Sequence, residues 1–279
     1  MAIIIFIALL VALILVHELG HFAVAKFFKI RVDEFGIFFP PRIASIKKGE
    51  TEYTINALPF GGFVKIFGEH AEDADNPRSF AGKPRLVQAA VIAAGVAMNI
   101  LFAWLILSVG YMAGLPTPSE SSIVGMVENA KTTVVAVLPG SPAERSGVLP
   151  EDEVQSVGTA GETQPLPLTA ERAQEFMRAH QEESIVLTVL RNEEEKVFVL
   201  RAQEGLVEGR KAIGIQMGDI GTLTLPPHTA LVQGAYLTYR ITVSTAEGLL
   251  QFFGNIFRAR ADFTEVAGPI GIVGIGAGA

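Results

Sequence analysis

The sequence predicts a membrane protein made of transmembrane α-helices, a cytosolic membrane-associated β-hairpin loop and an extracytoplasmic α+β domain. Apolar residues make up 49% of the 279 residues, the mean hydropathy is +0.40, and two long apolar runs lie in the first half of the chain. This composition is rich for a water-soluble protein and low for a pure helical membrane bundle. The net charge of −7, without a concentrated basic face, argues against nucleic acid as a partner.

The first apolar run predicts a transmembrane helix over residues 1–28. Residues 2–16 contain no polar side chain, and the run continues to Phe28 apart from the pentad HELGH (residues 17–21) and Lys26. It is long enough to cross a hydrocarbon core of roughly 30 Å. A cleaved signal peptide is the competing interpretation, but the run does not begin with Lys or Arg and no small-residue cleavage site follows it.

The second apolar run, residues 86–115, contains no charged side chain and predicts a second transmembrane helix. The positive-inside rule places residues 29–85 in the cytoplasm and the chain after Leu115 outside the bacterial cytoplasmic (inner) membrane. We therefore expect a multi-pass protein embedded in the lipid bilayer. The basic residues that support this orientation follow the first run or precede the second: Lys26, Lys29, Arg31, Arg42, Arg78, Lys83 and Arg85.

The cytosolic segment, residues 29–85, predicts a β-hairpin loop that re-enters the membrane face. Alternating apolar and polar residues predict strands over 42–48, 51–58 and 63–67, with a turn at Pro59-Phe60-Gly61-Gly62. Sheet backbone at membrane depth needs protein or a water-filled cavity to satisfy its hydrogen bonds, so we expect the loop to lie against the helices. A small surface sheet is the alternative.

Residues 119–220 have a globular composition and predict an α+β domain. One helix is expected over residues 170–181 with Thr169 as its N-cap, and His180 on its apolar face is interpreted as a packed histidine rather than a ligand. The expected strands cover residues 123–127, 133–138, 185–191, 196–202 and 212–217.

Part of this domain resembles bacterial PDZ domains. The resemblance is carried by VVAVLPGSPAERSG (residues 134–147) and PEDEV (residues 150–154), although Glu151 stands where that family usually has Gly. It implies that an extended peptide ligand binds as an added strand. The candidate edges are Ile213-Gly214-Ile215 and residues 123–127.

The C-terminal part of the chain has less regular hydropathy. Residues 228–260 have helical spacing of apolar side chains but include Arg240 and Glu247, so they predict an amphipathic helix at the membrane surface. Residues 268–279, rich in Gly and Ile, are expected to begin a third transmembrane helix that is truncated at Ala279.

The HELGH pentad carries residues suited to a metal-dependent hydrolase. Residues four apart share a helix face, so His17 and His21 can present imidazole nitrogens to one Zn²⁺ ion. Glu18 can act as a general base toward water and then as a general acid toward the departing amine. Burying two His and one Glu in an apolar run costs free energy unless they are paired, bind metal or face water. This cost argues against a motif without a function.

Together these motifs resemble the site-2 protease family, peptidase M50, of the bacterial regulator of sigma-E protease type with one PDZ domain. The resemblance implies an intramembrane zinc metalloendopeptidase that cleaves single-span regulatory membrane proteins, such as anti-sigma factors, with the PDZ domain gating access. It also implies that the loop bearing Pro59, Phe60, Gly61, Gly62 and Phe63 pairs with extended substrate. The motifs are HELGH, LPFGGFVKIFGE (residues 58–69), Asn99, PGSPAERSG and GPIGI (residues 268–272).

Two positions depart from that family. Asn99 resembles the last residue of a GPxxN pattern, but Val96 follows Gly95 here, and an interhelical hydrogen bond is an equal alternative for Asn99. The Asp that supplies the third zinc ligand in the family has no match in this sequence, so we expect it beyond Ala279. The carboxylates that do not replace it are Asp219, Glu247, Asp262 and Glu265.

Other classes of function stay open at this point. A catalytically inactive, membrane-anchored PDZ adaptor would keep the fold and the peptide-binding domain without turnover. A secondary transporter is weaker, because two spans without an inverted repeat do not build a transport pathway.

Overall fold

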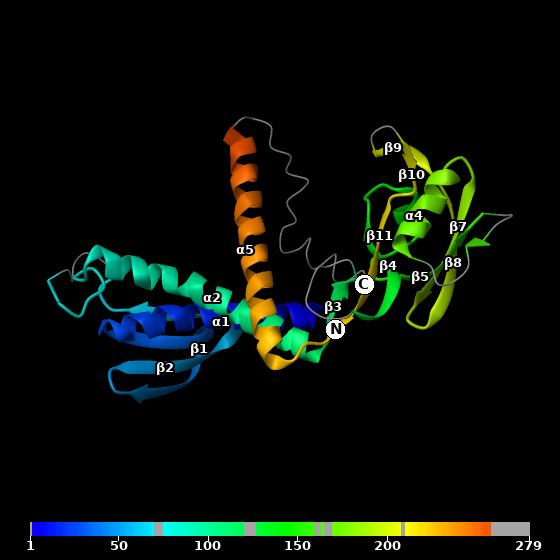
Figure 1. The fold of residues 1–279 in the computed structure, drawn as a ribbon. Helices are drawn as coiled ribbons and strands as arrows, with labels where there is room; N and C mark the ends of the chain where they lie inside the picture. The colour runs from blue at the N-terminus through cyan, green and yellow to red at the C-terminus, as the bar shows by residue number, and fades with distance from the viewer. Residues whose placement is uncertain are drawn as a thin grey trace. The chain divides into compact units, whose positions relative to one another are not determined.

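The computed structural model describes residues 2–69, 75–119, 127–159, 163–164, 169–207 and 210–257. The chain forms two compact units (Figure 1). The helical unit comprises residues 1–109 and 231–267, and the α+β unit comprises residues 110–230 and 268–279. The expectations for residues 123–126 and 268–279 lie outside the described residues.

Two helices of the described chain are long and apolar enough to cross a membrane. They are α1 (Ala2–Phe27) and α2 (Arg85–Ala113), and neither contains proline, which would break the hydrogen-bond ladder. The second helix ends earlier than predicted. Gly114 adopts φ +100° and stops it, and Leu115 instead begins β3 (Leu115–Pro118).

The two helices touch where α1 carries the HELGH pentad. A Cβ on Gly20 would lie 2.4 Å from the carbonyl oxygen of Ala94, so only glycine allows this approach. Apolar side chains elsewhere on both helices, such as Ile4 and Val109, are exposed. This distribution suits helices whose outer faces contact lipid rather than a protein core.

A sheet of β1 (Val32–Lys48) and β2 (Thr51–Ile66) packs against α1 on the side away from α2 (Figure 1). Residues 34–37 of β1 have partners at both 52–55 and 62–65 of β2, so they lie in the middle of the sheet. The change of direction predicted at residues 59–62 is present, because residues 52–55 and 62–65 of β2 run in opposite directions on the two sides of residues 34–37. The backbone stays extended within β2 through this reversal, and Gly61 adopts φ +66° there.

Glu34 joins the segments of this sheet through a nearly buried carboxylate. It accepts hydrogen bonds from Lys65 Nζ at 2.6 Å, Thr54 Oγ1 at 2.9 Å and Arg42 at 3.3 Å. Burial alone would raise the pKa of Glu34, but the bonds to Lys65 and Thr54 and the two positive charges outweigh it and hold the pKa below its ordinary value of 4.5.

The α+β unit contains one main sheet with strand order β3-β11-β4-β5-β7-β8, and β6 pairs with β5. Its helix α4 (Ala170–Ala179) begins as predicted, since Thr169 Oγ1 accepts the N–H of Arg172. Buried Val, Ile and Leu side chains of the sheet form the core with Ala173 and Phe176 of α4. The other elements are β4 (Glu128–Val137), α3 (Pro142–Arg145), β5 (Glu153–Gly158), β6 (Thr163–Gln164), β7 (Ser184–Arg191), β8 (Glu194–Arg201), β9 (Gln203–Val207), β10 (Arg210–Ala212) and β11 (Ile215–Leu223).

Two residues of this unit were singled out in the sequence, and the structure describes both. His180 is a packed histidine, because its ring stacks on Phe176 at 4.2 Å and its Nδ1 lies 2.9 Å from the Phe176 carbonyl oxygen. Glu151 adopts φ +72°, the conformation that glycine takes without strain.

The last described helix, α5 (Pro227–Phe257), covers most of the segment predicted as helical. Within the helical unit it packs against α2, where Trp104 Nε1 donates to the Leu231 carbonyl oxygen at 2.8 Å. A Cβ on Gly234 would lie 2.3 Å from Ser108 Oγ. The helix is therefore held to α2 through its first turns, while its position at the membrane surface stays a prediction.

The Glu34 bonds predict a specific pH dependence of stability. A carboxylate whose pKa is lowered by folding stabilises the protein above its unfolded pKa and loses this contribution as the pH falls through its folded pKa. Glu34→Gln should cost about 1.5–2 kcal/mol at neutral pH, because hydrogen bonds to a charge are lost but Lys65 and Arg42 are partly solvated. Thermal unfolding in detergent should show that the difference from wild type shrinks as the pH falls below 4.5. Glu175→Gln, on the exposed face of α4, is the control and should leave the profile unchanged.

Candidate metal centre

His17 and His21 lie one turn apart on the face of α1 that meets α2. Their ring centroids are 4.8 Å apart and the ring planes cross at 77°. A Cβ on Gly95 of α2 would lie 2.5 Å from Nε2 of both rings, so the two nitrogens are no more than about 5 Å apart. Both Nε2 atoms therefore converge on the space that the missing side chain of Gly95 leaves open, which we call the Gly95 gap.

The backbone of α2 fixes the orientation of His21. Nδ1 of His21 lies 2.7 Å from the carbonyl oxygen of Val91. A carbonyl oxygen only accepts, so Nδ1 carries the proton and Nε2 has a free lone pair. Val91 is itself 1% exposed in the core where the C-terminal end of α1, the sheet and α2 meet. The acceptor is therefore rigidly placed.

Asn99, also on α2, contacts the other histidine. Its Nδ2 lies 3.3 Å from Nδ1 of His17. Its Oδ1 is buried and has no hydrogen-bond partner among the described residues. An unpaired buried oxygen is costly, so its position beside His17 needs an explanation.

Glu18 faces the sheet rather than α2. It is half-buried, it interacts with the charges of His17, His21 and Glu69, and its carboxylate accepts the backbone N–H of Val64. Residues 62–66 pair with β1 on one side and have no strand partner on the other among the described residues. The carboxylate of Glu18 thus lies beside an open strand edge.

The five loop residues expected to bind substrate all lie in or next to that edge. Gly61 and Gly62 lie against α1, where added Cβ atoms would lie 3.0 Å from Ile14 and 2.7 Å from Leu15. Phe60 is 63% exposed, and Pro59 is also exposed. The Phe63 ring covers Gly36 in the middle of the sheet. The glycines bring the strand close to the helix that carries Glu18.

The residues present fit a zinc ion in part. Two imidazole nitrogens are ordinary zinc ligands at about 2.0–2.1 Å, and the Gly95 gap lies in front of both. Among the described residues no group of three or more His, Cys, Asp or Glu side chains is placed to hold a metal. Asp219 does not supply a third ligand, because it accepts hydrogen bonds from Thr132 Oγ1 and the Ala170 N–H in the α+β unit.

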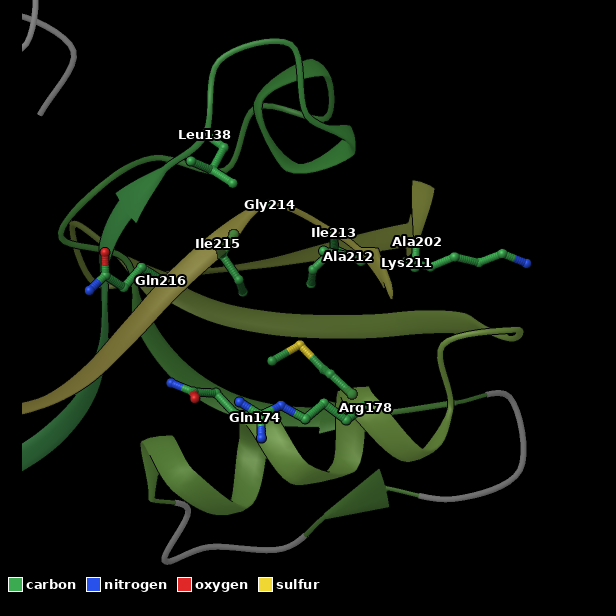
Figure 2. Close-up of a pocket in the computed structure, with 11 residues that line it drawn as sticks. Leu138, Gln174, Arg178, Ala202, Lys211, Ala212, Ile213, Gly214, Ile215 and Gln216 are labelled. Carbon is green, nitrogen blue, oxygen red and sulfur yellow. The ribbon is translucent and has the colours of Figure 1, made fainter. Parts of the chain in front are cut away.

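A second candidate site lies in the α+β unit. Ile213, Gly214 and Ile215 line a cavity of about 260 Å³, with α4 on its other side. Figure 2 shows the side chains of Ile213 and Ile215 pointing toward α4. Gly214 adopts φ +85°, and a Cβ there would lie 2.2 Å from Ser141 Cβ. The cavity is mainly apolar, with Arg178 and Lys211 at its border.

Sequence reasoning missed two features of the helical unit. The Val91 carbonyl leaves no trace in the sequence, because any residue type supplies it. A cavity of about 340 Å³ between α1 and the sheet, lined by Leu19, Phe22 and Ile46 among others, was also missed. The density of Phe residues in the loop was its only signal.

The sequence model of peptidase family M50 matches residues 5–279. The chain belongs to peptidase family M50. It is 44% identical over 142 residues to "Putative zinc metalloprotease CPE1693" of Clostridium perfringens, covering 51% of this chain and 38% of that protein. It is 34% identical to "Putative zinc metalloprotease all3971" of Nostoc, covering 97% and 73%. It is 28% identical to "Membrane metalloprotease ARASP, chloroplastic" of Arabidopsis thaliana, covering 97% and 60%.

These comparisons confirm the predicted family and support a membrane metalloprotease. The names of the relatives point to zinc as the metal. This M50 chain spans only part of the length of its relatives, 38% in the first case and 73% in the second. The activity of the whole protein is therefore argued as a proposal.

The Gly95 gap predicts that an added methyl group blocks the metal. In Gly95→Ala the new Cβ would overlap Nε2 of both histidines, so zinc affinity should fall at least about tenfold. The measurement is a zinc titration of purified full-length protein against a competing chelator.

Gly248→Ala is the matched control, because it is also a helical glycine and its Cβ would meet no atom within 4 Å. It should keep wild-type zinc affinity and stabilise α5 by about 0.5–1 kcal/mol. Unchanged zinc affinity in Gly95→Ala would show that the metal does not bind in front of Gly95.

Proposed function

We propose that this chain is an intramembrane zinc metalloendopeptidase that cleaves the transmembrane segments of single-span regulatory proteins. The observation that carries the proposal is the convergence of two imidazole Nε2 atoms on the Gly95 gap, inside a helix apolar enough to span a membrane. Polar groups at such a depth are expensive, so they mark a functional site. Anti-sigma factors, expected from the family resemblance, are the substrates proposed.

His17 and His21 would hold the zinc ion. When bound, zinc polarises the scissile carbonyl and lowers the pKa of water. Glu18 takes the proton of the attacking water on its carboxylate and returns it to the departing amine nitrogen. The His21–Val91 bond and the packing of α1 on α2 keep the ligands in place meanwhile.

The open edge of β2 suits a substrate in extended form. A helical substrate hides its scissile amide, since each backbone group is bonded within the helix. Pairing with residues 62–66 would replace those bonds and place the peptide beside Glu18. Pro59, Phe60 and Phe63 would then contact substrate side chains.

The location proposed is the bacterial cytoplasmic membrane, with the β1–β2 sheet on the cytosolic side and the α+β unit outside. We infer that the α+β unit is a PDZ domain that binds a peptide and limits substrate access. The apolar cavity between Ile215 and α4 supports this role, because strand addition needs a pocket beside an available edge.

One observation favours a second candidate, a membrane-anchored PDZ adaptor without turnover. The described residues bring together two histidines and no third metal-binding side chain. Such an adaptor would bind peptide but neither zinc nor a scissile segment.

Glu18→Gln should abolish cleavage while zinc stays bound, because the amide cannot accept the proton of water. The assay is cleavage of a model transmembrane peptide by purified full-length protein in liposomes, with zinc measured in parallel. Loss of at least about 10²-fold in rate is expected for a missing general base. Glu247→Gln on α5 is the control for a carboxylate lost from the helical unit. Cleavage by Glu18→Gln at the wild-type rate would exclude Glu18 as the base, and a zinc-free, inactive wild type would favour the adaptor.

The cavity beside α4 predicts that a substitution in its lining weakens peptide binding without changing the metal centre. Ile215→Ser removes apolar surface from the cavity lining and should weaken peptides selected on the wild-type protein by about tenfold, or about 1.4 kcal/mol. Val199→Ser, on β8 and 65% exposed, is the matched control and should bind normally. Fluorescence anisotropy with labelled peptides measures both variants. Equal affinities would place the peptide site elsewhere.

A further inference from the structure

We propose that Asn99 is a positioning residue of the metal centre, whose side-chain oxygen accepts the Nδ1–H of His17 and so leaves Nε2 of His17 unprotonated toward the ion. The proposal rests on zinc binding by His17 and His21, which the proposed function requires. It gives Asn99 a role that interhelical packing alone does not.

The first argument is the spacing of three residues on α2. Val91, Gly95 and Asn99 are four residues apart and therefore lie along one face of the helix. Each meets a different part of the histidine pair: Val91 contacts Nδ1 of His21, Gly95 faces both Nε2 atoms, and Asn99 contacts Nδ1 of His17. One helix face thus contacts both Nδ1 atoms and lies opposite both Nε2 atoms.

The second argument comes from the chemistry of the ring. An imidazole that binds a metal through Nε2 carries its proton on Nδ1, and that proton needs an acceptor. The Val91 carbonyl is the acceptor for His21. Asn99 holds the same place at His17, on the Nδ1 edge of the ring rather than the Nε2 edge. It is therefore placed to orient the ligand and not to bind the ion.

The third argument is the unpaired oxygen of Asn99. With Nδ2 toward Nδ1 of His17, Oδ1 is buried without a partner. A half-turn of the amide exchanges its nearly isosteric ends and places Oδ1 opposite the Nδ1–H. The buried acceptor then gains a donor, and His17 gains the tautomer that metal binding requires. The rotation pairs Oδ1 with the Nδ1–H of His17 and moves Nδ2 to the position that Oδ1 now holds.

The experiment compares Asn99→Ala and Asn99→Asp in purified full-length protein in detergent. Zinc affinity is measured by competition with a chelator, and the His17 tautomer of the metal-free protein is measured by ¹⁵N NMR. Asn99→Ala should lower zinc affinity 10–100-fold, the usual effect of removing such a hydrogen-bond partner. Asn99→Asp should keep affinity within about threefold of wild type, because a carboxylate also accepts the Nδ1–H. Wild type should show His17 protonated at Nδ1, and Asn99→Ala should shift it toward protonation at Nε2.

Ser108→Ala is the control for a buried polar residue of α2, since among the described residues its hydroxyl donates to the Trp104 carbonyl of its own helix. It should change neither zinc affinity nor tautomer. Wild-type zinc affinity in Asn99→Ala, or His17 protonated at Nε2 in the wild type, would overturn the proposal. If the wild type binds no zinc, the proposed function fails, and the tautomer comparison still tests the bond between Asn99 and His17.

Discussion

The candidate site depends on the close approach of α1 and α2. Gly20 brings the first helix against the Ala94 carbonyl, and Gly95 leaves open the space in front of both histidine Nε2 atoms. In a membrane there is no water to satisfy polar side chains, so the neighbouring helix must supply their partners. The Val91 carbonyl and Asn99 do so here. Small residues at the contact thus permit both the packing and the chemistry.

The sheet provides the other wall of the site. Because Gly61 and Gly62 lie against α1, the open edge of β2 lies next to Glu18 and not at a distance from it. Glu34 holds the segments of that sheet together through Lys65, Thr54 and Arg42. A charged network therefore ties the strand that forms this edge to the rest of the sheet.

The two candidate sites have different chemistry and belong to different folded units. The centre in the helical unit has two imidazoles and one carboxylate. The cavity of the α+β unit has mostly apolar walls with Arg178 and Lys211 at its border. Catalysis and recognition can therefore be tested by separate substitutions. Membership of peptidase family M50 supports the first role, and the second stays a proposal.

The sequence by itself determined the two long apolar helices and the candidate reacting groups, because both are local properties. Apolar runs predicted the two spanning helices, and a spacing of four predicted that His17 and His21 share a face. The Pro and Gly residues at 59–62 predicted a change of direction, but no local pattern predicted that the segments before and after it flank residues 34–37 of β1. Only the tertiary structure decided which groups surround the histidines. The Val91 carbonyl, the Gly95 gap and the unpaired Oδ1 of Asn99 matter because of what packs against them, and packing between distant segments is not encoded in any local pattern.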